Sequence, residues 1–556
     1  MRPHPPTGTK NDRFLKWFLF GCAGASIVFG ALYLASVTII APKLVDTARQ
    51  RTQDYLSKRF KSNVEIAAFH LRVFPTIRIE ADGIVLRHQG RTDVPPMITI
   101  EEASFDANFE GLIGRKVDVN SVRLKGLTVN TPPRKPGAPP MFKGTDDNLA
   151  EKYPVVIHHI IADDVSLVML RRPEDSDKPP SVFEIHALRL QNFSFSHPAS
   201  FQALLTNPKP RGLIHCQGEF GPWLADDPSE TPVDGVYTFQ NADMSTLKGL
   251  KGTMQSTGHF RGPLDYLNVD GETEIPDFAL RTSAHPMALH TDYSAIVDGT
   301  NGNTILKNVT ASFLHTTLSV HGEVVNLKKK TKGRTIELYT TSSAARIEDL
   351  LTLAVNNSPP AMTGPVRLNA RIDIPEEDTD LIDRMNIDGH FGVGDMQFTN
   401  PKVQSKVDSL SRRAQGQPKN DEITGELAQL KGTFKMANST IDMSNLVFAV
   451  DGANIDLAGT YQMDSGQLDF RGHLKMDAKL SQATTGIKSF FLKAVDPFFE
   501  KKGAGTYLPI KITGTKDHPN YGLDFRDKAN QGDKNGKAKD DKGKNEQANR
   551  DPANAP

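Results

Sequence analysis

The chain has 556 residues and carries 66 Lys and Arg against 66 Asp and Glu, so its formal net charge is zero. No global electrostatic field exists to attract a polyanion, which removes the main support for a nucleic-acid partner. Its two cysteines, Cys22 and Cys216, lie far apart in the sequence, so no internal disulfide is expected.

The first predicted element is an apolar segment at residues 17–41, which contains no charged side chain. As a helix it would be about 38 Å long, enough to cross the hydrocarbon core of a bilayer. The segment exceeds the apolar part of a signal peptide and no clear Ala-x-Ala site closes it, so an uncleaved anchor is favoured over a cleaved signal. We therefore predict a transmembrane helix at 17–41 that follows a cytoplasmic N-terminus at 1–16.

Residues 42–130 are predicted to begin with a short amphipathic helix, because apolar residues fall at helical spacing up to about Asn63. From Val64 the apolar residues recur at every second position, which is typical of half-buried strands. Residues 131–147 are rich in proline and predict a stiff linker or loop.

The middle region, residues 148–400, continues the strand pattern. The motif Gly258-His-Phe260 has an echo in Gly389-His-Phe391, which suggests a degenerate internal repeat. Residues 345–354 and 378–385 are predicted to be helical.

The last ordered region, residues 401–525, begins with a predicted polar loop at 412–421 and then shows the clearest alternation. A meander of antiparallel strands with one apolar and one solvated face is expected here. The apolar positions, which are also the candidates for a lipid groove, are Leu446, Phe448, Val450, Ile455, Leu457, Tyr461, Met463, Leu468, Phe470, Leu474 and Met476.

Two further segments complete the expected organisation. Residues 487–499 place their phenylalanines on one stripe and predict an amphipathic helix, and a strand pattern resumes at 507–525. Residues 526–556 have alanine as their only apolar residue type and are predicted to be a disordered tail.

No catalytic or metal-binding motif stands out. His158 and His159 are adjacent, which in a strand directs them to opposite faces, and His285 and His290 lack the spacing and the glutamate of a zinc-protease motif. Neither a glycine-rich phosphate loop nor a nucleophile elbow is evident. We expect no enzyme, no cofactor and no metal.

An apolar sheet face must be covered by another sheet, by helices, or by something other than protein. Few helices are predicted, so one interpretation is a trough left partly open for acyl chains, with lipid headgroups in solvent at its rim. The other interpretation is a pair of ordinary β-sandwiches whose apolar faces cover each other. Periodicity alone does not decide between them.

Short strand motifs stand at both ends of the chain: Val64-Glu-Ile66, Val73-Phe-Pro-Thr-Ile-Arg-Ile79, Leu112-Ile-Gly-Arg-Lys-Val-Asp-Val119, Val122-Arg-Leu-Lys-Gly-Leu-Thr-Val129, Leu508-Pro-Ile-Lys-Ile-Thr-Gly-Thr-Lys-Asp-His-Pro519 and Gly522-Leu-Asp-Phe525. Together with the preceding span they resemble the AsmA-like family of bacterial envelope proteins. The resemblance implies an inner-membrane anchor and a periplasmic repeating β-groove related to chorein-type lipid-transfer proteins. It also implies a role in phospholipid transport or outer-membrane homeostasis.

The expected fold is therefore mainly β with a few helices: an N-terminal transmembrane helix, then an elongated, curved antiparallel sheet that forms an apolar groove. The expected partners are phospholipid acyl chains and the inner membrane. An alternative of a different class is a structural or assembly factor that binds outer-membrane or other envelope proteins through exposed strand edges. An envelope hydrolase has the least support.

Overall fold

A computed structural model describes most of residues 62–524 and a few residues between 49 and 57. The larger gaps are at 108–116, 132–154, 170–180, 225–229, 326–334 and 484–504, with shorter gaps elsewhere. The described chain is mainly β, as the alternating sequence predicts.

The chain divides into two units. One comprises residues 1–341, 352–356 and 372–384, and the other comprises residues 342–351, 357–371 and 385–556. Each unit is built on antiparallel strands joined mainly by short turns.

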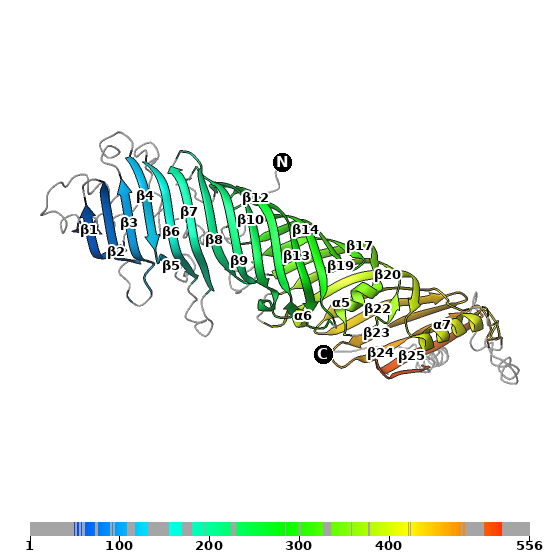
Figure 1. The fold of residues 1–556 in the computed structure, drawn as a ribbon. Helices are drawn as coiled ribbons and strands as arrows, with labels where there is room; N and C mark the ends of the chain where they lie inside the picture. The colour runs from blue at the N-terminus through cyan, green and yellow to red at the C-terminus, as the bar shows by residue number, and fades with distance from the viewer. Residues whose placement is uncertain are drawn as a thin grey trace, which may run out of the picture. The chain divides into compact units, whose positions relative to one another are not determined.

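The strands of the first unit are β1 (Ser62–Arg72), β2 (Ile77–His88), β3 (Ile98–Ala107), β4 (Val117–Lys125), β5 (Thr128–Thr131), β6 (Val155–Met169), β7 (Ser181–Ser194), β8 (Ala199–Pro208), β9 (Arg211–Phe220), β10 (Pro232–Asp243), β11 (Leu250–Lys251), β12 (Thr253–Pro263), β13 (Leu267–Leu280), β14 (Met287–Val297), β15 (Thr304–Phe313), β16 (Thr316–Val325) and most of β17 (Thr335–Arg346). A 3₁₀ turn (Met244–Thr246) follows β10. From β6 to β10, each strand pairs with the next strand along the chain. The two-residue β11 is passed over, and β10 pairs with β12 instead. From β12 to β17, consecutive strands pair again. Figure 1 shows β7 to β10 side by side in this order.

Not every pairing is antiparallel, which corrects the expected all-antiparallel sheet. β4 and β5 both run parallel to β6, with Val117 opposite Val155 and Thr128 opposite Ser166. The two short strands together line the 15 residues of β6 and are separated at Gly126, whose φ of 63° lies in the left-handed region that glycine tolerates. β4 and β5 thus act as one interrupted strand that pairs with β6 in parallel. The sequence could not predict this, because the alternation within a strand does not indicate the direction of its neighbour.

The second unit contains α5 (Ile347–Ala354, shared with the first unit), β18 (Met362–Thr363), most of β19 (Pro365–Ile374), β20 (Asn386–Phe398), α7 (Pro401–Ala414), β21 (Ala428–Ala437), β22 (Thr440–Val450), β23 (Ala453–Gln462), β24 (Gln467–Met476), β25 (Thr506–Thr515) and β26 (Pro519–Leu523). Strands β20 to β26 pair consecutively and antiparallel. The predicted C-terminal meander is confirmed.

The helices agree with the sequence in part. The segments 345–354 and 378–385 contain α5 and α6 (Leu381–Arg384), as predicted. The prediction of a polar loop at 412–421 is wrong for residues 412–414, because α7 extends to Ala414. Its start is fixed by Asn400, whose side chain accepts from the Lys402 N–H, and by Pro401 in the first turn.

Several predicted segments lie outside the described residues: the span at 17–41, most of the linker at 131–147, the helix at 487–499 and the tail at 526–556. The residues described between 49 and 57 are helical, in line with the short helix expected there. Within the described part of the chain, no helix has both the length and the apolar character to cross a membrane.

The largest buried core of the first unit lies on β1 to β8. One face of these strands supplies it, as Ile79 opposite Phe105 and Ala81 opposite Ala103 illustrate. Ile79 is 0% and Phe105 1% exposed. The apolar face of β1 to β6 is therefore mostly covered, whereas Leu188 and Leu190 on β7 and Leu205 on β8 are only half-buried.

Candidate functional site

The groove candidates predicted from the sequence gather on one face of the second unit. Leu446 lies opposite Leu457, Phe448 opposite Ile455, and Ile455 opposite Leu474. The same register brings together the other candidates in β22, β23 and β24, namely Val450, Tyr461, Leu468, Phe470 and Met476. Met463 follows the end of β23 and is half-buried. The alternation thus identified a shared face correctly.

Neighbouring strands extend this face with residues that sequence reasoning missed. They are Phe391 on β20, Leu430 and Phe434 on β21, and Leu508, Ile510 and Ile512 on β25. Strand β21 alternates strictly between inward and exposed side chains along Ala428–Ala437, and this period-two pattern was a usable signal. We call the inward side of β20 to β25 the C-terminal apolar face.

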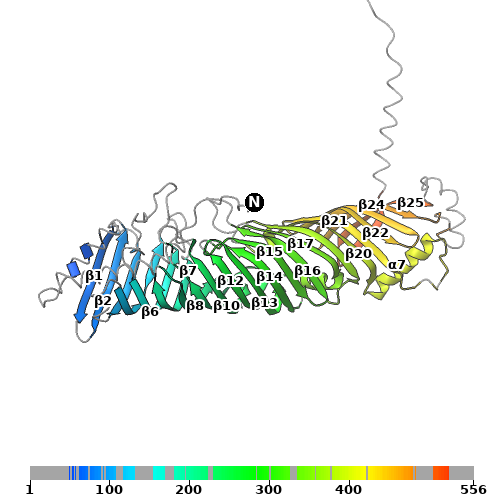
Figure 2. The same cartoon turned by 90° about the horizontal axis from the view of Figure 1, so that it is seen from above.

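One end of the C-terminal apolar face is covered by α7. The helix contacts β20, β22 and β23, and the Ser411 hydroxyl donates to the Asp451 carbonyl at 3.0 Å. Figure 2 shows α7 beside these strands. The side chains in the last row of the face, near these strand ends, are buried: Met396, Ala428, Val450, Ala453 and Met476.

Away from α7 most of the large side chains on this face are only half-buried. Phe448, Leu457 and Leu474 all belong to this group, although Phe470 is buried at 7% exposure. A sheet face packed against a second protein layer would bury such residues as completely as Ile79 and Phe105 are buried. The C-terminal apolar face therefore keeps hydrocarbon surface in contact with solvent.

The opposite side of the same strands is polar. Lys475 donates to Asp456 at 2.7 Å, and Lys435 forms an ion pair with Asp388 at 2.8 Å. The hydrogen bond with Asp456 raises the pKa of the Lys475 ammonium above its ordinary value. Each strand thus separates a hydrated face from an apolar one.

The first unit carries a comparable surface on β8 to β16, which we call the central apolar face. Phe201, Gly218, Gly235 and Phe260 form one row across four strands. The two phenyl rings lie 6.5 Å apart, above glycines that leave room for them; a Cβ on Gly235 would approach the Phe260 ring at 2.8 Å. Two adjacent glycines thus lie between the two large rings of this row.

A similar arrangement of phenylalanine rings and glycines occurs in the second unit, at the motif that the sequence suggested as a repeat. Gly258 and Phe260 lie on the central apolar face, and Gly389 and Phe391 lie on the C-terminal apolar face. The Phe391 ring packs 6.1 Å from Phe434, which itself lies over Gly389. The histidine between glycine and phenylalanine points to the polar side in both copies.

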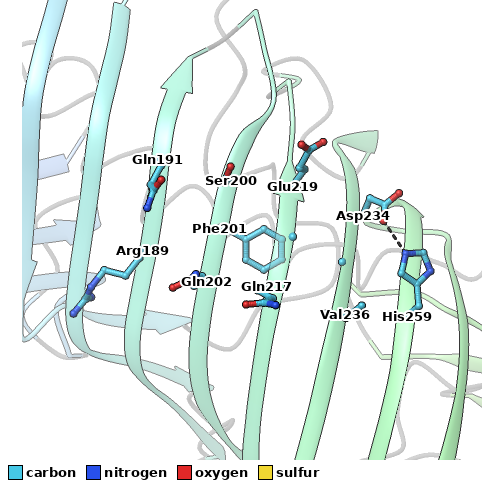
Figure 3. Close-up of a pocket in the computed structure, with 12 residues that line it drawn as sticks. Arg189, Gln191, Ser200, Phe201, Gln202, Gln217, Glu219, Asp234, Val236 and His259 are labelled. Atoms are coloured by element: carbon cyan, nitrogen blue, oxygen red, sulfur yellow. Dashed lines mark hydrogen bonds and ion pairs between the residues drawn. The ribbon is translucent and has the colours of Figure 1, made fainter.

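A depression of the described surface lies on the polar side of the first unit. It has a volume of about 640 Å³ and is shallow and open. Figure 3 shows Gln191, Gln202 and Gln217 at its floor, with His259 beside Asp234 at 2.8 Å. These polar side chains are exposed and belong to the face opposite the central apolar face, although Phe201, Gly218 and Gly235 of that face also line the depression.

The histidines and the free cysteine take part in no catalytic arrangement that the described residues reveal. His158 pairs with Asp118 at 2.7 Å, and His290 is held between Glu274 and Asp292. Burial raises the pKa of the Cys216 thiol to about 11, which leaves it protonated and unreactive at neutral pH. No group of three potential metal ligands occurs among the described residues.

No family model, no curated protein and no solved structure matches this chain.

Proposed function

We propose that this chain is a lipid-binding protein of the bacterial envelope, anchored in the inner membrane by residues 17–41 with its β-sheet in the periplasm. It would hold phospholipid acyl chains against its apolar faces and contribute to phospholipid transport or outer-membrane homeostasis. In this proposal the chain is a non-enzymatic carrier. The observation that carries it is the half-buried state of large side chains on the C-terminal apolar face, such as Phe448, Leu457 and Leu474, and of Phe201 and Phe260 on the central apolar face.

Acyl chains suit these faces because hydrocarbon needs no directional hydrogen bonds. Each methylene group removed from water contributes about 0.8 kcal/mol. A chain lying across the strands would meet successive apolar side chains such as Phe448, Ile455 and Leu474. The charged headgroup would remain in solvent at the rim of the face.

The strand edge at β26 favours a second candidate, an assembly factor that binds a partner polypeptide. Within the described chain β26 pairs only with β25, and it exposes Tyr521 by 66% and Leu523 by 40%. An extended segment could add to such an edge through backbone hydrogen bonds. Cross-links from Tyr521 would then trap polypeptide rather than lipid.

Two aspartate variants of the full-length chain test the lipid proposal. Leu457→Asp places a charge on the C-terminal apolar face, whereas Ala458→Asp places the same charge on the exposed polar side of the same strand. We expect Leu457→Asp and Phe448→Asp to lose co-purifying phospholipid, measured by mass spectrometry of solvent extracts. Ala458→Asp should retain it.

Circular dichroism provides the folding control for these variants. If Leu457→Asp and Phe448→Asp keep the wild-type β-sheet spectrum and retain all bound phospholipid, the C-terminal apolar face is not the lipid site.

A further inference from the structure

A group of hydroxyls interrupts the central apolar face at β10 to β14. Tyr237 on β10 and Tyr293 on β14 lie in one row with Gly258 and Gly271 between them. The next row contains Ser256, Thr273 and Thr291. All of these except Ser256, which is buried, are half-buried. The rows on either side are apolar, with Phe260 and Val269 on one side and Ile275 and Leu289 on the other.

Four of these hydroxyls form one hydrogen-bonded network. Ser256 donates to the Glu272 carbonyl at 2.8 Å and accepts from Thr273 at 3.0 Å. The Tyr237 and Tyr293 hydroxyls lie 3.3 and 3.2 Å from Ser256 Oγ and also hydrogen-bond each other. Because the Ser256 proton is committed to a backbone carbonyl, the tyrosines donate to Ser256 or to one another. Each of the four hydroxyl protons then has an acceptor, either another hydroxyl of the network or the Glu272 carbonyl. Some lone pairs of the hydroxyl oxygens remain free to accept a hydrogen bond.

The glycines fix where the two tyrosine hydroxyls lie. A Cβ on Gly258 would come within 2.8 Å of the Tyr237 ring, and a Cβ on Gly271 within 2.8 Å of the Tyr293 hydroxyl. The rings can therefore lie over these two positions only because no side chain occupies them. Their hydroxyls meet between the strands and face the same surface as the neighbouring apolar rows.

Thr291 lies directly opposite Thr273 and is outside the network. Among the described residues it makes no side-chain hydrogen bond, although it is half-buried on an apolar face. A directly opposed pair of side chains stands about 5 Å apart at Cβ. One ligand oxygen could therefore accept from Thr291 and donate to a free lone pair of Thr273 or a tyrosine.

We infer that these five residues bind a hydroxyl group carried within the acyl chain of the ligand, so that the central apolar face selects hydroxylated chains over plain ones. A hydroxyl is both donor and acceptor, which matches the free Thr291 proton and the free lone pairs of the network. On an uninterrupted apolar face the same hydroxyl would lose its hydrogen bonds with water and weaken binding. The inference rests on the proposed lipid-binding function and adds the chemistry of the lipid.

Ricinoleic and oleic acids test this selection, because they differ only by one mid-chain hydroxyl. Each acid displaces a fluorescent fatty acid from the full-length wild-type chain, and the ratio of their affinities is recorded. The same ratio is measured for Thr273→Val with Thr291→Val, which removes two hydroxyls and preserves shape. Thr310→Val is the matched control, since Thr310 lies opposite Asp292 on the polar side.

We expect ricinoleic acid to bind more tightly than oleic acid to the wild type and to Thr310→Val. In the double variant ricinoleic acid should bind about five- to tenfold more weakly, with oleic acid unchanged. Equal ratios in all three proteins, with both acids binding, would overturn the hydroxyl inference and leave the lipid-binding proposal intact. Failure of the fluorescent fatty acid and of both competing acids to bind would overturn the lipid-binding proposal and the inference with it.

Discussion

Strands β1 to β6 and strands β20 to β25 alternate apolar and polar residues in the same way, yet their apolar faces differ in burial. Ile79 and Phe105 in the first group are buried almost completely, whereas Leu457 and Phe434 in the second are half-exposed. Alternation determines which face of a strand is apolar, but not what covers that face. In this chain the N-terminal face packs into a protein core, and the C-terminal face is left for hydrocarbon in the proposed function.

The largest expected difference between the two regions comes from a buried charge. Ile79→Asp would place a carboxylate in the N-terminal core without a partner, which costs several kcal/mol and should prevent folding. Leu457→Asp keeps access to water and should fold. Soluble yield and the far-ultraviolet β-sheet signal compare the two variants. Normal folding of Ile79→Asp would contradict the closed core.

Truncation of a phenylalanine should also destabilise the N-terminal region more than the C-terminal region, but by a smaller margin. Phe105→Ala should lower the free energy of unfolding by about 3–5 kcal/mol, because it leaves a cavity in a packed core. Phe434→Ala should lower it by about 1–2 kcal/mol, since the ring is already partly hydrated. Urea unfolding measures both. Equal losses would mean that the two faces are equally covered.

Glycine substitutions probe the close approach of strands within the second unit. A Cβ on Gly472 would lie 1.8 Å from the Asp456 carbonyl oxygen, whereas a Cβ on Gly394 would meet nothing within 4 Å. Gly472→Ala should therefore destabilise the chain by about 1–3 kcal/mol, and Gly394→Ala should be close to neutral. Thermal unfolding of the two variants provides the comparison, and a neutral Gly472→Ala would contradict this packing.

The smallest effect is expected on the polar side, where charges are exposed. The hydrogen bond with Glu274 raises the pKa of His290 above its ordinary value of 6.5, and Asp292 acts in the same direction. The stabilisation is complete below that ordinary value and is lost as the pH rises through the folded pKa. His290→Gln should remove this small pH dependence. Nuclear magnetic resonance titration of the imidazole would contradict the account if its pKa were not raised.

Most of the strand pattern and the shared face of Leu446, Leu457 and Leu474 were predictable, because period two places alternate residues together whatever the fold. The parallel pairing of β4 with β6 was not, since it depends on chain direction beyond a single strand. Helix α7 was missed although Asn400 and Pro401 are a recognisable start signal. Val403, Val407, Leu410 and Ala414 also stand at helical spacing, so the helix was detectable although the segment is otherwise polar.

The degree of exposure and the hydroxyl network were beyond sequence reasoning. The distance between Tyr237 and Tyr293 along the chain is 56 residues, and their meeting depends on the register of four strands and on two intervening glycines. A slip of one residue in any of these strands would move its side chains to the opposite face.

The most direct measurement uses a fatty acid with a photoactivatable diazirine, bound to the full-length chain and cross-linked by light. Mass spectrometry then maps the labelled residues. The account predicts labels on inward positions such as Leu446, Leu457 and Leu474, with Asp456 and the buried Ile79 spared. Labelling spread equally over both sides of β23, or absent from β22 to β24, would contradict the claim that this face holds acyl chains.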